Sequence, residues 1–495
     1  MKISNNTFTK ILFLLCTYCY VLSGNAQEVM RLTLDEAIAK GQGQSPSAQL
    51  VETRWTTSRS QLQADMSVFK PQVTLNGRIP QIQRINFRNT LPDGRQSFVR
   101  QANLNTGLNL QLSQSLAATG GRVSIGSSFD YLYDFGVGGQ DAYSQYATDM
   151  IFVEFAQPIF GFNELKWEKK LAPLRYSLAT RQYAENMESL AVEGATLFFD
   201  LYTAQLTLEA TETEKLNADT LFEISKGRFS VGRIAETDLL QIELSSMNAN
   251  ARLAAAILQK QTATEALRNF FGIKDIEGFE LVPPTDLPSY ILDVEEAVQY
   301  SRNNRSNSLE FQTRLLRADR NLAQAKGNNG FRIDVFARVG LAQNALEFEE
   351  VYKDPQDAQQ INVGFSLPIA DWGVAESRIE IAESLRELEQ MQVEQERINI
   401  DQQVILRVQQ FDLVREQVAL ALKAYEVSQK REFITRKRYL IGKIGVTELN
   451  LALQEQNAAL QTYISALSAF WLAHYELRAL TLYDFERGVS LVRDE

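Results

Sequence analysis

Strict alternation of apolar and polar residues predicts β-strands in both halves of the chain. Leu108, Leu110 and Leu112 alternate with Asn109 and Gln111, and residues 123–135 alternate in a similar way. The pattern returns over residues 331–341 and 361–367. A period of two places the apolar side chains on one face of a strand and the polar ones on the other. We expect four strands in the first half and two in the second.

Long stretches almost free of glycine and proline follow the strands in each half. Only Pro173 and Gly194 interrupt the first of them, and the apolar residues recur near heptad spacing, which is typical of packed helices. A stretch of about 60 residues forms a helix of about 90 Å. The expected helices are 33–69, 164–226 and 234–271 in the first half, and 293–327, 374–437 and 445–480 in the second.

The two halves repeat one pattern. Residues 228–239 recur at an offset of 210 as residues 438–449, whereas residues 34–38 match 294–298 at an offset of 260. The difference means that the first half carries 50 additional residues among its strands. We predict an internal duplication with a first repeat (27–273), a linker (274–292), a second repeat (293–480) and a C-terminal segment (481–495).

The N-terminal 26 residues have the pattern of a secretory signal peptide. Lysines precede an apolar core over residues 11–22, which is too short to span a bilayer, and small residues stand before Gln27. Both cysteines, Cys16 and Cys19, lie in this segment, so the mature chain contains no thiol. Large residues precede each cysteine, which disfavours lipidation. We therefore expect an exported protein that does not depend on disulfides.

Composition and charge exclude several functions. The chain has 50 basic and 61 acidic residues, a net charge of −11, and no basic block, which argues against nucleic acid as a partner. A single histidine and two cysteines leave little material for metal, cysteine-nucleophile or serine–histidine chemistry. We expect no enzymatic activity and no cofactor, and we interpret His474 as a structural residue.

Two interpretations of the strands remain: a half-buried sheet in a soluble domain, or a membrane β-barrel. Export, and polar faces rich in asparagine, glutamine, serine and glycine, favour the barrel. The tight turn at 118–121 suits the periplasmic side, and the longer links at 88–98, 135–145 and 343–359 suit the outside. Six strands cannot close a membrane barrel, and open edges are not tolerated in lipid, so several chains must share one barrel.

The order of motifs resembles the TolC-like outer membrane efflux proteins. The motifs are the helix starts Leu34-Asp35-Glu36-Ala37 and Val294-Glu295-Glu296-Ala297, the strand exits Gln157-Pro158-Ile159-Phe160 and Leu367-Pro368-Ile369, and the turns Phe229-Ser230-Val231-Gly232 and Tyr439-Leu440-Ile441-Gly442.

This resemblance implies a mixed α and β membrane protein. In the family, a homotrimer forms an outer-membrane β-barrel that continues into a periplasmic α-helical barrel, with an equatorial belt that here would include residues 274–292 and 481–495. The usual member contributes four strands to a twelve-stranded barrel. The 50 additional residues depart from that pattern. Either the barrel has eighteen strands, or the extra hairpin packs elsewhere.

The resemblance also assigns roles at the two helical turns. It implies a pore gate at Glu448, with Leu451 at the next position of the ring, and a closed-state lock from Tyr439 to Thr237 and Asp238. Ile444 stands where the family has an arginine in the lock. Ordinary helix-hairpin glycines and a solvated glutamate are the simpler alternatives. The adaptor-docking tips would be Val231, Gly232, Arg233, Ile441, Gly442 and Lys443.

The function implied is an exit channel of a tripartite efflux system in the outer membrane of a Gram-negative bacterium, extending into the periplasm. Its partners would be a periplasmic adaptor, an inner-membrane pump and outer-membrane lipid. The same fold also serves as the exit duct of type I protein secretion. A non-conducting outer-membrane coiled-coil scaffold is the alternative from a different class.

Overall fold

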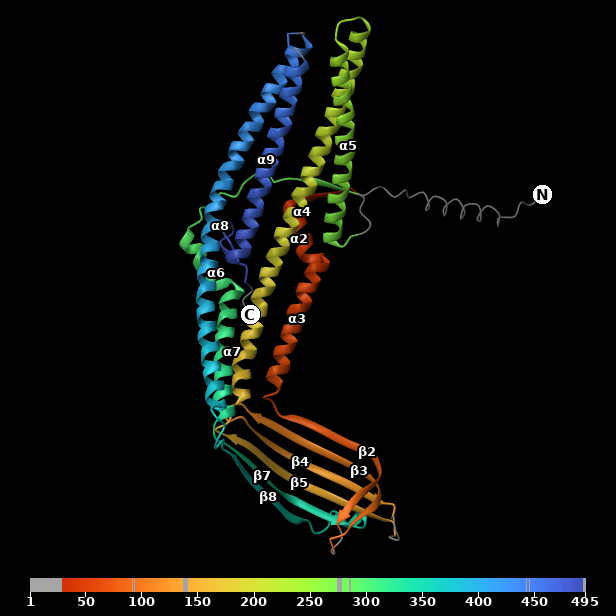
Figure 1. Cartoon of the computed structure of the whole chain (residues 1–495), viewed down its shortest axis with the longest axis vertical. Helices are drawn as coiled ribbons and strands as arrows, with labels where there is room; N and C mark the ends of the chain where they lie inside the picture. Colours follow the sequence, from red (N-terminus) through yellow and green to blue (C-terminus); the bar gives the residue numbers. More distant parts are fainter. Residues whose placement is uncertain are drawn as a thin grey trace, which may run out of the picture. The chain divides into compact units, whose positions relative to one another are not determined.

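The computed structural model describes residues 29–90, 92, 94–136, 141–273, 278–284, 286–441, 443–444 and 446–492. The expected signal peptide, residues 1–26, lies outside them. The chain is a mixed α and β protein with long helices (Figure 1). No helix among the described residues combines the length and apolar character needed to cross a bilayer.

The elements follow the same order in both halves (Figure 1). The first half contains β1 (Val29–Thr33), α2 (Leu34–Gln44), α3 (Pro46–Ser67), β2 (Gln72–Thr90), β3 (Gln96–Leu116), β4 (Gly121–Asp134), β5 (Tyr143–Ile159), α4 (Glu164–Ser230) and α5 (Glu236–Phe271). The second half contains β6 (Gly278–Val282), α6 (Val294–Asn304), α7 (Ser306–Asn329), β7 (Arg332–Ala345), the 3₁₀ turn η1 (Phe348–Glu350), β8 (Gln356–Ser366), α8 (Val374–Leu440), α9 (Val446–Thr481), β9 (Tyr483–Asp484) and β10 (Val489–Ser490).

The chain divides into two compact units. The first, which we call the helical unit, comprises the chain up to Trp55, Thr180–Ser306 and the residues from Asn399 onward. The second, which we call the sheet unit, comprises Thr56–Ala179 and Asn307–Ile398.

The opening helix of each half is divided, where the sequence predicted continuous helices over 33–69 and 293–327. Ser45 adopts an extended conformation before Pro46, because a proline disfavours the helical region for the residue that precedes it. Arg305 is also extended, with ψ of 155°. There the Ser306 N–H and hydroxyl donate to the Glu185 carboxylate at 2.8 and 2.7 Å, which caps the new helix start.

The sheet unit contains one antiparallel sheet with the order β2-β3-β4-β5-β7-β8. The four strands expected in the first half, β2 to β5, therefore lie in the same sheet as the two expected in the second half, β7 and β8. The extra hairpin does not pack elsewhere in this chain. β2 and β8 are the two edge strands. The helix end of the sheet, where α3, α4, α7 and α8 join the strands, includes Gln72 and Ser366; we call the opposite end the outer end.

The helical unit is held together by aromatic and aliphatic side chains at the base of two helical hairpins, α4 with α5 and α8 with α9 (Figure 1). Its fully buried aromatic residues include Phe198, Phe199, Phe271, Phe411 and Phe470. β1 pairs in parallel with β6, which ties the start of the mature chain to the segment between the repeats. This pair, and the small β9–β10 hairpin, were not predicted from the sequence.

Candidate functional site

The ends of the two helical hairpins have the same backbone turn. Gly232 has φ of +72°, a conformation that glycine adopts most readily. The Arg233 N–H donates to the Arg228 carbonyl at 2.9 Å, and the Lys443 N–H donates to the Arg438 carbonyl at 3.0 Å. In both turns the N–H donates to the carbonyl five residues earlier, which is a hydrogen bond of the Schellman motif at the ends of α4 and α8. Gly442 lies outside the described residues.

Each turn exposes one large apolar and one basic side chain. Val231 and Ile441 are each 67% exposed. Arg233 and Lys443, two residues further on, are exposed as well. The predicted docking residues within the described part of the chain are therefore accessible to a partner.

The predicted gate residues lie at the start of α9. Glu448 is exposed in the first helical turn, where the helix dipole favours a carboxylate. Leu451 is 49% exposed. Thr237 and Asp238 are exposed in the first turn of α5. The side chain of Tyr439 lies outside the description, so the closed-state lock stays a prediction.

The sheet has one continuous apolar face and one polar face, as the alternation predicted. On the polar face the Arg338 guanidinium lies 2.7 Å from the Asp149 carboxylate, 3.2 Å from that of Glu154 and 4.1 Å from the centre of the Phe152 ring. The strand register joins the apolar residues into a single surface. Its members include Val73, Leu75, Leu108, Leu110, Leu112, Ile125, Val153, Val339, Leu341, Ile361, Val363 and Phe365, all of them at least 39% exposed.

Aromatic side chains form a belt toward the outer end of this apolar face. The rings of Tyr131 and Tyr146 lie 5.0 Å apart, and those of Tyr133 and Phe135 lie 5.1 Å apart. An apolar band that ends in aromatic residues is typical of a sheet that meets lipid on one side and water beyond it.

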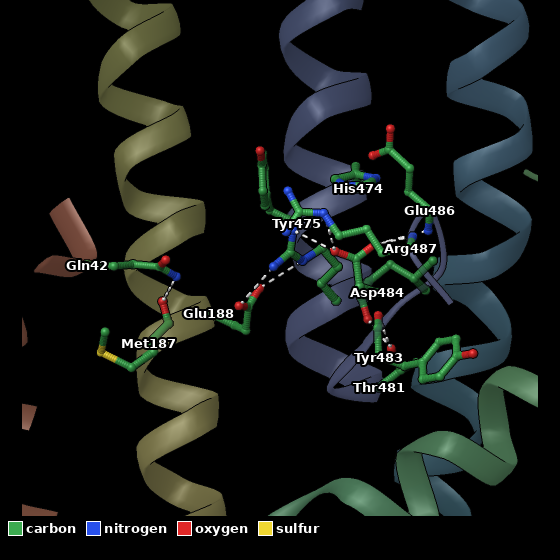
Figure 2. A network of polar contacts seen from close by, with 12 residues as sticks. Gln42, Met187, Glu188, His474, Tyr475, Thr481, Tyr483, Asp484, Glu486 and Arg487 are labelled. Atoms are coloured by element: carbon green, nitrogen blue, oxygen red, sulfur yellow. Dashed lines mark hydrogen bonds and ion pairs between the residues drawn. The ribbon is translucent and has the colours of Figure 1, made fainter. Parts of the chain in front are cut away.

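Figure 2 shows a buried ionic network in the helical unit that the sequence analysis missed. Two guanidinium nitrogens of Arg478, on α9, donate to the carboxylate of Glu188, on α4, at 3.1 Å each. Arg478 also lies 3.4 Å from the Asp484 carboxylate in β9. Burial raises the pKa of Glu188, and the neighbouring Arg478 opposes this shift. Glu188 lies 290 positions from Arg478 in the sequence, so no local pattern predicts this contact.

His474 is a buried structural residue, in keeping with its interpretation from the sequence. It is 2% exposed, and its Nδ1 lies 2.8 Å from the Tyr290 hydroxyl. Burial lowers the pKa of His474 to about 4, and Arg478 adds to the shift. The imidazole is therefore neutral at pH 7, and a neutral ring pairs with a hydroxyl without burying a charge.

Acidic residues in the described part of the chain can serve as metal ligands or as helix caps. No group of three or more histidine, cysteine, aspartate or glutamate residues there is arranged to hold a metal ion. The Asp371 carboxylate accepts from the N–H groups of Gly373 at 3.1 Å and Ala375 at 2.8 Å. Asp371 therefore caps the start of α8.

Comparisons with known proteins give relatives of one kind. Residues 95–272 match the family described as Outer membrane efflux protein. Outer membrane protein TolC of Escherichia coli is 23% identical over 276 residues, which are 52% of this chain and 54% of TolC, so the chain spans about half the length of this curated relative.

Solved structures match over almost the whole chain. The CmeC outer membrane channel of Campylobacter jejuni has a TM-score of 0.65 at 14% identity, covering 93% of this chain and 87% of CmeC. The outer membrane protein VceC of Vibrio cholerae has a TM-score of 0.62 at 12% identity, covering 92% of this chain and 96% of VceC. The chain shares the fold of these proteins.

Proposed function

We propose that the chain, which resembles the TolC-like outer membrane efflux proteins, is an exit channel in the outer membrane of a Gram-negative bacterium and extends into the periplasm. In the proposed role it conducts substrates across the outer membrane after a periplasmic adaptor and an inner-membrane pump have delivered them. The channel itself needs no catalytic group, because the energised partner supplies the driving force.

The observation that carries the proposal is the six-stranded sheet with an exposed apolar face, a charged opposite face and two unpaired edges. Lipid would cover the apolar face, and water would fill the lumen beside Arg338, Asp149 and Glu154. A sheet with free edges is unstable in lipid, so copies of the chain must close it. Three copies would give a barrel of about eighteen strands, wider than the twelve-stranded barrel of the usual family member.

The helical turns supply the remaining parts of the proposed channel. Adaptor docking would use Val231, Arg233, Ile441 and Lys443, which are exposed. Glu448 of three copies would form an acidic ring at the pore, where its negative charge would favour cations. Leu451 would add an apolar constriction.

Single-channel recording in planar bilayers tests this proposal. We expect discrete conductance steps from the mature protein, and reduced cation selectivity in Glu448→Ala. The matched control is Glu236→Ala, which removes an exposed glutamate from the first turn of α5, outside the proposed ring. Equal conductance in all three proteins would remove Glu448 from the gate and leave the channel in place.

A silent wild type needs a second variant. Tyr439→Phe removes the hydroxyl of the proposed closed-state lock to Thr237 and Asp238, and should raise the open probability. If both proteins remain silent while the oligomer is intact on an unheated gel, the chain is a scaffold and the channel proposal is wrong.

A further inference from the structure

The β2–β3 hairpin, which contains much of the additional sequence of the first half, carries a group of arginines on the apolar side of the sheet. Arg84, Arg88 and Arg100 share the face of Leu104, because Ile82 pairs with Leu104 and Arg84 with Ala102 in the register. They continue that face beyond its apolar band, toward the outer end. No described carboxylate lies within ion-pair distance of these three arginines.

Their contacts leave the positive charge uncompensated within the described chain. The Arg84 guanidinium lies 5.3 Å from the centre of the Phe135 ring, next to the aromatic belt. Arg88 donates to the amide oxygen of Gln96 at 3.1 Å. These are contacts to neutral groups, in a chain whose net charge is −11.

The β7–β8 hairpin carries the opposite charge at the same end of the sheet. Phe348 packs on Phe129 and Tyr146 with ring centres 5.8 Å apart in both pairs, which places this segment against the aromatic belt. None of its acids forms an ion pair with a described residue. The acidic residues are Glu347, Glu349, Glu350, Asp354 and Asp357, against one lysine, Lys353.

We propose that these two hairpins form a charged seam between neighbouring copies of this chain, in which the β2–β3 arginines of one copy lie against the β7–β8 acids of the next. The proposal rests on the closed oligomeric barrel of the proposed function. The two hairpins contain the two edge strands of the sheet, so joining β8 to the β2 of a second copy brings opposite charges together. The opposite charges of the two hairpins therefore favour a second copy of this chain as the partner.

The register shows where the charges would meet. The row of paired residues that begins at Gln72 on β2 ends at Gln360 on β8, six residues from Ser366 at the helix end. If Gln72 of the next copy pairs with Ser366, the strands are displaced along their own direction by six residues, or about 20 Å, for each copy. One copy spans six strand spacings of about 4.8 Å. The resulting strand tilt is about 35°, within the range of outer-membrane barrels.

With this alignment Asp357 of one copy lies opposite Ile82 of the next, adjacent to Arg84. Asp357 faces the apolar side, as Arg84 does, because it pairs with Leu341 in the register. Asp354 of the first copy lies level with the residues that follow Ile82 on β2 of the next copy. Charges at the edge of the membrane sit in a lower dielectric than bulk water, so the attraction is stronger than between fully solvated groups.

A charge-swap experiment on the full mature protein tests the seam. We expect the double variant Arg84→Glu/Arg88→Glu to lower the temperature at which the unheated oligomer dissociates on a gel by about 5 °C or more. Adding Asp354→Arg/Asp357→Arg should restore most of the loss, because the opposite charges are then exchanged. Arg59→Glu/Arg317→Glu, on exposed residues of α3 and α7, makes the same change in net charge and should leave the dissociation temperature near that of the wild type.

Two results would overturn the seam. In the first, the double variant lowers the dissociation temperature only in vesicles that contain anionic lipid, and the added aspartate-to-arginine changes do not restore it. The arginines would then bind lipid phosphate. The other is an unchanged dissociation temperature in the double variant. If the wild type itself forms no heat-sensitive oligomer, the closed barrel of the proposed function fails instead, so the two failures are distinguishable.

Discussion

At the residue scale, the buried ions of the helical unit show how partners distant in sequence depend on one another. Glu188 is 6% exposed and Asp484 is 2% exposed, and Arg478 is the cation that both carboxylates share. A buried carboxylate that loses its partner keeps the cost of desolvation without the attraction that offset it. This cation joins α4 to the C-terminal hairpin, through Glu188 and Asp484, both labelled in Figure 2.

Arg478→Met should therefore destabilise the helical unit strongly. We expect a loss of about 3–5 kcal/mol in the free energy of unfolding, because Glu188 is left buried without its cation, whereas Asp484 keeps two backbone N–H donors and Arg487 at 3.9 Å. The control is Arg252→Met, which breaks the half-exposed ion pair with Glu214 and should cost at most about 1 kcal/mol. Circular dichroism during denaturant titration measures both. Equal losses would mean that Arg478 is not a shared buried cation.

His474 makes stability depend on pH in one direction. Its pKa falls from 6.5 to about 4 on folding, so between these values the unfolded chain binds the extra proton. The contribution is complete above pH 6.5 and is lost as the pH falls toward 4, by about 3 kcal/mol in total. His474→Gln should remove this component from the pH profile of the melting temperature. An unchanged slope between pH 6.5 and 4 would contradict the assignment.

At the scale of the elements, α2 and α5 approach closely because a glycine lies between them. A methyl group on Gly41 would lie 2.5 Å from the Phe270 ring, whereas one on Gly43, two residues later in the same helix, would meet no atom within 4 Å. Gly41 is thus required by packing, and Gly43 is not. The helix itself begins at Thr33, whose capping box with Glu36 is readable from the sequence.

The pair Gly41→Ala and Gly43→Ala should separate packing from helix propensity. We expect Gly41→Ala to destabilise by about 1–3 kcal/mol, because the Phe270 ring must move. Gly43→Ala should be neutral or stabilise by up to about 1 kcal/mol, because alanine favours the helix. Thermal melts of the two variants provide the comparison, and similar melting temperatures would show that α2 does not pack on α5 as described.

At the scale of the whole molecule, the number of strands and the position of the edges control assembly. β2 and β8 lie at opposite edges of the sheet, five strand spacings apart, or about 24 Å if the sheet were flat. A disulfide requires Cα atoms within about 7 Å. A bridge between these two strands therefore has to join two copies of the chain.

The chain without the predicted signal peptide (1–26) is suited to this test because it contains no cysteine. We expect Leu75→Cys/Val363→Cys to form a disulfide-linked oligomer under oxidation, visible on a non-reducing gel after heating. Leu75→Cys/Leu110→Cys, whose residues pair within one sheet, should form only an intrachain bridge. The same test can be made with the second cysteine at Ile361 or Phe365 instead of Val363. If none of these three variants gives linked chains, β2 and β8 do not meet in the assembly.

Much of this fold was predictable because its signals are local. Alternation identified β3, β4, β7 and β8 of the large sheet, and the absence of glycine and proline placed the ends of the four long helices within a few residues. Breaks that depend on distant partners were not predictable: the division at Arg305 is stabilised by Glu185, 120 residues away in the chain. The candidate tip residues came from a resemblance, and Gly232 and Arg233 lie in the turn that it implied.

The sequence by itself determined the four long helices, the two-sided character of the strands and the confinement of both cysteines to the first 26 residues, since these follow from the period of the pattern and from composition. Only the tertiary structure decided which strands are neighbours, that the extra hairpin joins the sheet at its edge, and which buried charges share Arg478. The pairing of β5 with β7 and the contact of Glu188 with Arg478 join residues more than a hundred positions apart, and no local period encodes such contacts.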